Sequence, residues 1–282
     1  MSPPRTLLVT GAGSGLGLAI ARAAIAAGER VVGVVRREAD GEALEALDRE
    51  RARAVLLDVT DFNRIDGVVA AAIARHGPID VLVNSAGYGH EGVLEEAPLE
   101  DLRRQLDVNL FGAVAMIKAV LPHMRSRRRG HIVNITSMAG QVGLPGIAYY
   151  AASKYALEGV SEALAHELAP FGVRVTALAP GSFRTDWAGR SMVRAPRRIA
   201  DYDAVFDPIR QARQAKSGRQ NGDPERLAQV LLRVVAMGDP PVHLLLGSDA
   251  LGLVEPALKA RLQQLTAWEA VTRSTDYGEA RP

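Results

Sequence analysis

The 282-residue sequence predicts a single doubly wound α/β domain, in which helices cover both faces of a seven-stranded, mostly parallel sheet. Three observations predict this fold. Short apolar runs alternate with segments of helical periodicity through most of the chain. Glycine is frequent, at 27 residues, and aromatic residues make up only 5%, which suits tight turns between strands and helices. No internal repeat and no linker divides residues 1–282 into smaller units.

Each element is predicted from its own residues. Runs rich in Val, Leu and Ile predict strands at 6–9, 31–35, 54–57, 79–83, 131–136, 173–178 and 242–246. Helical periodicity predicts helices at 16–27, 41–51, a stretch ending at 77–78, 99–125, a stretch carrying residues 150 and 154, 223–238 and 255–267. The polar end, 274–282, is expected to fray.

The composition limits the classes of function. Without cysteine, the chain forms no disulfide and has no thiolate for catalysis or metal binding. Its six histidines show no metal-binding spacing, so we expect no metal. A net charge of +2 gives no support to nucleic-acid or membrane binding. No apolar run approaches the roughly 20 residues of a membrane helix, and the first residues lack the core of a signal peptide. We expect a cytoplasmic protein.

A glycine-rich turn, TGAGSGLG, joins the first predicted strand to the first helix. Glycines let the backbone approach a phosphate closely, and the free N–H groups at a helix start attract an anion. The spacing is G-x-x-x-G-x-G, on which the common dinucleotide pattern G-x-G-x-x-G cannot be placed. A plain tight turn is the alternative, but the flanking strand and helix favour a cofactor site. Its residues would be Thr10, Gly11, Ser14, Gly15, Leu16 and Gly17.

The second predicted strand ends in Arg36 and Arg37. In dinucleotide-binding folds an acid at this point binds the ribose 2′-hydroxyl of NAD, whereas an arginine accommodates the 2′-phosphate of NADP. The pattern therefore favours NADP over NAD. The alternative is that both arginines are solvated at a strand end. Asp40 follows closely, and we expect it to be the N-cap of the helix at 41–51.

Two polar groups elsewhere need an explanation. The fourth strand ends in Asn84, followed by Ala86 and Gly87, whose small size would let the chain pass under an adenine ring. Asn84 could equally cap backbone groups in a turn. Asn109 lies within a long predicted helix, where its polar atoms require a partner or water.

The sequence Tyr150-Ala-Ala-Ser-Lys154 carries the predicted chemistry. On a helix these two side chains lie on one face, so an ammonium can stabilise a phenolate and lower the pKa of the phenol. Tyr150 is the candidate acid/base. Ser137 follows the fifth strand, at the sheet edge where α/β folds bind ligands.

The segment 182–222 departs from the alternating pattern and is too long for an ordinary connection. We expect it to be a substrate lid. Its aromatic residues favour an apolar substrate, whereas its arginines leave an anionic one possible. These arginines include Arg184, Arg190, Arg194, Arg197 and Arg198.

Taken together, these residues resemble the short-chain dehydrogenases/reductases. The resemblance extends from about residue 7 to residue 246. It rests on the glycine turn, on Asp58 after the third strand, on N-x-A-G at 84–87, and on the P-G motif and a following threonine, Pro180, Gly181 and Thr185. The family's four catalytic positions correspond to Asn109, Ser137, Tyr150 and Lys154. One departure is Ser85, where the family commonly has a second Asn.

The resemblance implies a role for each residue. Ser137 would hold the substrate oxygen, Tyr150 would exchange its proton, and Lys154 would bind the nicotinamide ribose. Asn109 would hold a water that links Lys154 to solvent. Asp58, with Val59 beside it in the cofactor site, would meet the adenine, and Thr185 the nicotinamide carboxamide.

We therefore expect a Rossmann-type oxidoreductase that transfers a hydride between NADP(H) and a small-molecule carbonyl or secondary alcohol. As in the family, we expect a homodimer or homotetramer. Two alternatives stay open: a non-enzymatic NADP-binding regulatory protein of the same fold, and a nucleotide-sugar epimerase or dehydratase. The chain is short for the extra substrate domain of the latter.

Overall fold

A computed structural model describes residues 3–189 and 191–277 of the chain. Its main sheet has seven strands in the order β3-β2-β1-β4-β6-β7-β9, and every neighbouring pair is parallel. The predicted sheet is confirmed. Its strands are β1 (Thr6–Thr10), β2 (Arg30–Val35), β3 (Ala52–Leu56), β4 (Val81–Asn84), β6 (Gly130–Ile135), β7 (Val173–Pro180) and β9 (His243–Leu246). The order reverses between β1 and β4, so a crevice is expected at their carboxyl ends.

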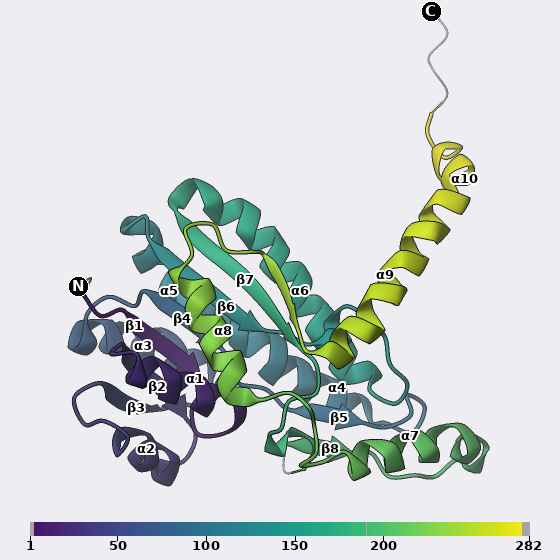
Figure 1. Ribbon diagram of the computed structural model, residues 1–282, viewed down its shortest axis with the longest axis horizontal. Helices are drawn as coiled ribbons and strands as arrows, with labels where there is room; N and C mark the ends of the chain where they lie inside the picture. The colour runs from purple at the N-terminus through teal and green to yellow at the C-terminus, as the bar shows by residue number, and fades with distance from the viewer. Residues whose placement is uncertain (1–2, 190, 278–282) are drawn as a thin grey trace, which may run out of the picture.

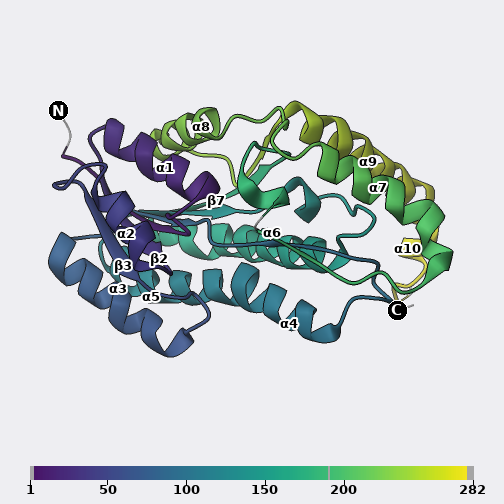
Figure 2. The same cartoon turned by 90° about the horizontal axis from the view of Figure 1, so that it is seen from below.

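Helices cover both faces of this sheet (Figures 1 and 2). One face packs against α1 (Gly15–Ala26), α2 (Glu38–Glu45) and α8 (Pro224–Ala236), and the other against α3 (Phe62–His76), α5 (Gly112–Ser126) and α6 (Ala148–Leu168). Alternation along β1 shows how one strand serves both layers. Leu7 and Val9 belong to the first apolar cluster and Leu8 to the second.

The predicted helix at 99–125 contains a defect at Asn109. It consists of α4 (Leu99–Leu106), a π-helical turn η1 (Asp107–Phe111) and α5. Wider turns of this kind are rare and often mark functional sites. Contrary to the expectation from the sequence, the run 99–126 is long and apolar enough to span a membrane by length and composition, and 33% of its apolar window is buried. Met116 and Ile117 belong to the buried cluster on this face of the sheet.

Two predicted helix starts are wrong. Helix α2 begins at Glu38 with Arg37 as its N-cap, so Asp40 lies in its first turn, and the helix ends at Glu45. Helix α9 (Ser248–Ala267) begins at 248 rather than 255, because Gly247 adopts a φ of 112° and turns the chain directly from β9 into the helix. Helix α9 continues into α10 (Glu269–Arg273) and extends away from the body (Figure 1). Most of the tail expected to fray, 278–282, lies outside the described residues.

The segment 182–222 is ordered into elements over its described residues. It contains the 3₁₀ turns η4 (Asp186–Ala188) and η5 (Ala200–Tyr202), strand β8 (Met192–Arg194) and helix α7 (Asp203–Ala215). Strand β8 pairs in parallel with β5 (Gly89–Glu91), forming a small sheet that the sequence did not predict. The two ends of the segment lie side by side, since the backbone N–H of Arg184 donates a hydrogen bond of 2.8 Å to the carbonyl oxygen of Gly222. Two further 3₁₀ turns are η2 (Met138–Gly140) and η3 (Ala169–Phe171).

Candidate active site

A cleft of about 650 Å³ lies at the carboxyl ends of the strands. The glycine turn lines one part of it, and the segment 182–222 lines another. Ser137, Tyr150 and Lys154 all face this cleft. The topology therefore gathers most of the predicted cofactor and catalytic residues in one space.

The glycine turn is shaped so that no side chain fills it. Gly11 and Gly15 have φ values of 69° and 55°, a region that favours glycine. A Cβ atom on Gly17 would lie 2.3 Å from the carbonyl oxygen of Gly11. Gly11, Gly15 and Gly17 line the cleft together with Ser14 and Leu16. Each glycine is therefore required by the turn's conformation or its close packing.

The amino end of α1 fits a phosphate. Ser14 is the N-cap, but its side chain makes no capping hydrogen bond, and the first turn contains no acidic residue. The first N–H groups of a helix have no partner inside the helix and favour an anion. The turn and helix start thus fit the pyrophosphate of a dinucleotide.

Thr10 supports this turn from behind. Its hydroxyl oxygen accepts hydrogen bonds of 3.0 Å from the backbone N–H groups of both Ser85 and Ala86. Thr10 itself does not line the cleft. It joins the glycine turn to the loop after β4, which brings Ala86 and Gly87 to the cleft wall.

Arg36 and Arg37 have different surroundings. Arg36 lines the cleft, whereas Arg37 does not. The guanidinium of Arg37 forms an ion pair of 2.6 Å with Asp40, which raises the pKa of Arg37. Asp40 faces the cleft beside Gly13, whose added Cβ would lie 2.8 Å from the Asp40 Cβ. Of the two arginines, Arg36 is thus the one at the cleft wall.

Asn84 is placed away from the cleft. Its Nδ2 donates to Oδ1 of Asn134 at 2.9 Å, and the residue is buried between β4 and β6. It therefore holds two strands together, rather than lining the cleft. Asp58 and Val59 do line the cleft, and Oδ1 of Asp58 accepts a hydrogen bond of 3.0 Å from the backbone N–H of Thr60.

The loop after β7 forms another part of the cleft wall. Pro180, Gly181 and Thr185 line the cleft. The Thr185 Cβ lies 3.8 Å from where a Cβ on Gly15 would be, so the start of the lid stands over the glycine turn. A cofactor bound along the turn would lie beneath Thr185.

Ser137 and Tyr150, two of the predicted catalytic residues, lie within hydrogen-bonding reach of each other. Ser137 begins η2, and its Oγ accepts a hydrogen bond of 3.1 Å from the backbone N–H of Ala139. Burial raises the pKa of Tyr150 to about 12, and a hydrogen bond from Ser137 acts in the opposite direction. A phenol with this pKa is protonated at neutral pH and can donate its proton.

Lys154 lies one helical turn beyond Tyr150. Its Nζ is 5.8 Å from the centre of the Tyr150 ring and donates a hydrogen bond of 2.8 Å to the carbonyl oxygen of Ile135. Burial lowers the pKa of Lys154 to about 8, against the opposing effect of Glu158. That Lys154 lowers the pKa of Tyr150 stays a prediction, since burial dominates the pKa of the phenol here.

Asn109 is held by protein groups rather than facing the cleft. Its Nδ2 donates to the carbonyl oxygen of Tyr88 at 3.0 Å and to Oγ of Ser153 at 3.1 Å, and its Oδ1 accepts from the N–H of Tyr88. Gly87 lies beside both Asn109 and Lys154. The π-helical turn thus anchors the loop after β4 next to the catalytic lysine. The water-holding role stays a prediction.

Apolar side chains surround the reactive end of the cleft. The ring of Trp187 lies 5.1 Å from that of Tyr150, inclined at 57°. Leu144, Ile147 and Met192 complete this wall. Trp187 thus contacts the candidate acid/base, and the sequence could not predict this contact because its segment had no clear periodicity.

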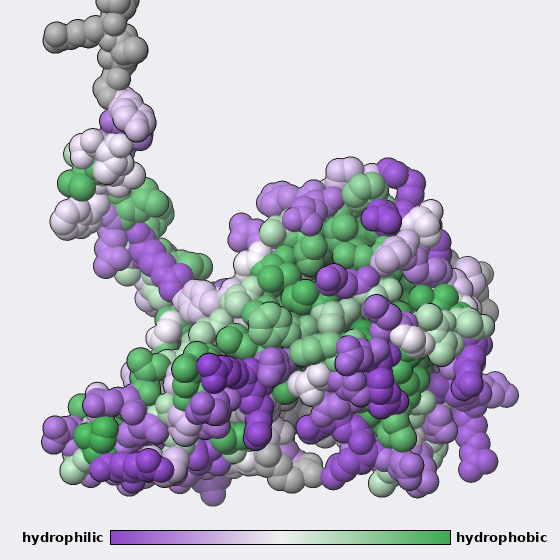
Figure 3. Space-filling view, turned by 180° about the vertical axis from the view of Figure 1, so that it is seen from behind, coloured by the Kyte–Doolittle hydropathy of each residue, from purple (hydrophilic) through white to green (hydrophobic). Residues whose placement is uncertain are grey.

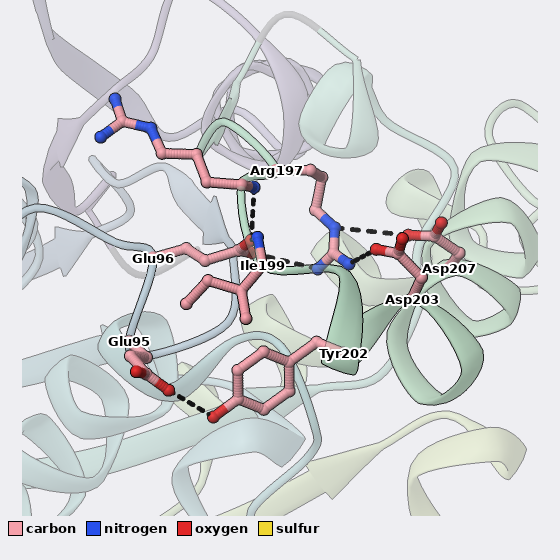
Figure 4. Close-up of polar contacts among 8 residues, drawn as sticks. Glu95, Glu96, Arg197, Ile199, Tyr202, Asp203 and Asp207 are labelled. Carbon is pink, nitrogen blue, oxygen red and sulfur yellow. Dashed lines mark hydrogen bonds and ion pairs between the residues drawn. The ribbon is translucent and has the colours of Figure 1, made fainter.

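Two buried glutamates bind the arginines of the lid. Glu91 pairs with Arg194 at 3.0 Å and with Arg213 at 3.2 Å. Glu96 accepts hydrogen bonds from the side chain of Arg197 and from the backbone N–H groups of Arg198 and Ile199. Figure 4 shows Glu96 at the centre of this cluster.

These contacts show which partners the arginines of segment 182–222 have. Arg194 and Arg197 are neutralised by buried carboxylates, and the guanidinium of Arg184 donates to the carbonyl oxygen of Gln220. Arg190 lies outside the described residues. The glutamate partners could not be predicted, because Glu96 and Arg197 are separated by 101 positions.

Comparisons with known proteins agree with this arrangement. The family described as short chain dehydrogenase matches residues 5–193. An oxidoreductase BOA17 from Botryotinia fuckeliana is 39% identical over 253 residues, covering 89% of this chain and 91% of that protein. A 3-ketodihydrosphingosine reductase from Bacteroides thetaiotaomicron is 36% identical, covering 86% and 88%. The crystal structure of a short-chain dehydrogenase from Streptomyces avermitilis superposes with a TM-score of 0.91 at 41% identity, covering 98% of this chain and all of that one.

Proposed function

Because the chain belongs to the short-chain dehydrogenase/reductase family, we propose that it transfers a hydride between NADP(H) and a carbonyl or secondary alcohol. One observation carries the proposal. Tyr150, Ser137 and Lys154 meet at one end of the cleft whose other part is the glycine turn. A bound nicotinamide cofactor supplies the hydride.

The protein side of the reaction is a proton transfer. Ser137 holds the carbonyl oxygen of the substrate by a hydrogen bond. In reduction, the carbonyl carbon gains the hydride and its oxygen takes the proton of Tyr150. Lys154 is charged near neutral pH and stabilises the phenolate that is left. In oxidation the same groups act in reverse.

The preference for NADP rests on Arg36. This arginine lines the cleft just past β2, where a 2′-phosphate would lie. Asp40, on the same stretch of wall, is paired with Arg37, which reduces its repulsion of a phosphate. These features support NADP more strongly than NAD.

The cleft favours a neutral, apolar substrate. Trp187, Leu144, Ile147 and Met192 line its reactive end. The lid cations Arg194 and Arg213 are held by Glu91, so they offer less charge to an anionic substrate. The relative from Bacteroides thetaiotaomicron is also named as the reductase of a ketone.

Loss of NADPH absorbance tests the proposal when the protein is mixed with ketones, aldehydes, steroids and sugars. Turnover is expected with an apolar ketone, and Tyr150→Phe should abolish it while NADPH binding stays within about twofold. A Tyr150→Phe protein of normal activity would refute the acid/base role. If no compound turns over although NADPH binds, the regulatory alternative is supported.

A homodimer or homotetramer and a cytoplasmic location complete the proposal. Helix α9 presents exposed apolar side chains at Leu258, Leu262 and Leu265, and Figure 3 shows apolar surface on this protruding helix. Such a stripe would be covered by another subunit. Light scattering after chromatography measures the assembly, and Leu262→Glu should reduce its mass.

A further inference from the structure

A buried carboxylate lies directly behind the catalytic residues. Glu158 is 7% exposed and lies on α6, one turn after Lys154. One of its oxygens accepts a hydrogen bond from the hydroxyl of Thr136, and the other accepts one from Nδ1 of His243 at 2.8 Å. These two donors stabilise a carboxylate that would be costly to bury alone.

The contacts of Glu158 tie together three elements of the fold. Thr136 follows the last residue of β6 and precedes Ser137, so its bond to Glu158 fixes the strand end on which Ser137 lies. His243 is the first residue of β9, at the edge of the sheet. Its side chain is 41% exposed, so the network reaches from the catalytic centre to solvent.

The charged groups near Glu158 come from α6 and β9. Lys154 precedes it by one turn, and Glu162 follows by one turn with its carboxylate 3.9 Å from Nε2 of His243. Glu162 is 62% exposed, where water screens its charge. Arg261 of α9 binds the hydroxyl of Tyr155 instead. Glu158 is the residue whose negative charge raises the pKa of Lys154.

We propose that Glu158 is a positioning residue, which orients Ser137 through Thr136 and keeps Lys154 charged during the reaction. This rests on the proposed function, since it concerns the setting of the same catalytic groups. His243 supports the role by binding the second oxygen of Glu158. No bond is made or broken at Glu158.

The direction of the expected pH shift follows from the negative charge of Glu158. Glu158→Gln keeps the shape and can still accept from Thr136, but it removes the negative charge. Without that charge the ammonium of Lys154 loses its proton more readily, and the phenolate of Tyr150 forms more readily. Both changes move the alkaline limb of kcat/KM for reduction to lower pH, by about 0.5 to 1 unit, as expected for a nearby buried charge.

The experiment compares full pH profiles of the wild type, Glu158→Gln and Glu162→Gln. The last is the matched control, since it removes the same charge from the same helix at an exposed position. Glu162→Gln should leave the alkaline limb of the pH profile unchanged. Glu158→Asp keeps the negative charge, so its alkaline limb should lie between those of Glu158→Gln and the wild type. A Glu158→Gln profile that coincides with the wild type would overturn the proposal, as would an equal shift in Glu162→Gln.

A second readout does not depend on turnover. The chain contains four lysines, Lys118, Lys154, Lys216 and Lys259. Competitive acetylation at a series of pH values, followed by peptide mass spectrometry, gives the pKa of each. Glu158→Gln should lower that of Lys154 by about 0.5 to 1 unit and leave the other three unchanged. An unchanged Lys154 titration overturns the role of Glu158, whereas an active Tyr150→Phe protein would refute the proposed function instead.

Discussion

The ammonium nitrogen of Lys154 donates a hydrogen bond of 2.8 Å to the backbone carbonyl oxygen of Ile135. Ile135 is the last residue of β6, two positions before Ser137. A side chain from α6 therefore fixes the strand end that carries a second catalytic group. The cost is a buried charge, because burial lowers the pKa of Lys154 from 10.5 to about 8.

We predict that Lys154→Met abolishes turnover and stabilises the fold at neutral pH. At 1.36 kcal/mol per pKa unit, the shift corresponds to a destabilisation of roughly 3 kcal/mol by the buried ammonium. The lost hydrogen bond from the ammonium to Ile135 costs about 1.5–3 kcal/mol, so the net change lies between none and about 1.5 kcal/mol in favour of the variant.

The pH dependence of stability distinguishes the removal of a buried charge from improved packing as the cause of this stabilisation. Since the folded pKa lies below the unfolded one, the unfolded chain binds more protons between about pH 8 and 10.5. Wild-type stability therefore gains from Lys154 as pH rises through that window. The advantage of Lys154→Met in urea unfolding should shrink over the same range. Lys118→Met, at an exposed position of α5, should show no such trend.

Arg36 and Arg37 provide a matched pair for cofactor preference. Arg36→Asp should lower the ratio of kcat/KM for NADPH over NADH by about 10- to 100-fold, because a charge-assisted bond is worth roughly 1.5–3 kcal/mol. Arg37→Gln should lower the ratio by a smaller factor, since Arg37 lies outside the cleft and acts only through its pairing with Asp40. An unchanged ratio in Arg36→Asp would show that the 2′-phosphate is bound elsewhere.

Of two glycine substitutions, one should weaken cofactor binding and the other should stabilise the fold. In Gly17→Ala the new Cβ would lie 2.3 Å from the carbonyl oxygen of Gly11, so the turn must open. We expect NADPH affinity to fall at least tenfold by fluorescence titration. Gly67 lies inside α3 with nothing within 4 Å of an added Cβ. There Gly67→Ala should raise the unfolding free energy by about 0.5–1 kcal/mol.

Much of the fold could be predicted because its information is local. Each strand of the main sheet is a short apolar run, and strands with helices on both faces need apolar residues throughout. The proximity of Tyr150 and Lys154 could be predicted from their spacing, since the two residues are one helical turn apart. Their approach to Ser137 followed from the rule that ligands bind at the carboxyl ends of such strands.

Contacts between distant residues could not be predicted in this way. Strand β5 is only three residues long and pairs with β8 about 100 positions later. The partners of Glu91 and Glu96 are equally remote in sequence. Arg37 is a different case, because its partner Asp40 lies only three positions away and their pairing depends on where α2 begins. Side chains that hold the lid and tune the site thus appeared only in the folded chain.

The contacts of Glu96 lead to a prediction about the lid. Its carboxylate accepts two backbone N–H groups, which lower its pKa, and one guanidinium. Glu96→Gln replaces one acceptor oxygen by an NH₂ group facing donors, so the lid should open more often. We expect faster trypsin cleavage after Arg197 or Arg198 and a KM for substrate raised severalfold, with NADPH affinity unchanged.

The neighbouring glutamate supplies the control for this prediction. Among the described residues Glu95 forms one hydrogen bond, with the hydroxyl of Tyr202, at an exposed position, so Glu95→Gln should leave both cleavage and KM near wild type. Acid should act like the substitution, because a carboxylate of lowered pKa contributes stability above its ordinary pKa and loses it as pH falls through the folded value. Cleavage by pepsin between pH 5 and 3 should therefore accelerate first within 195–203. Equal protection of that segment in Glu96→Gln and the wild type would show that Glu96 does not hold the lid.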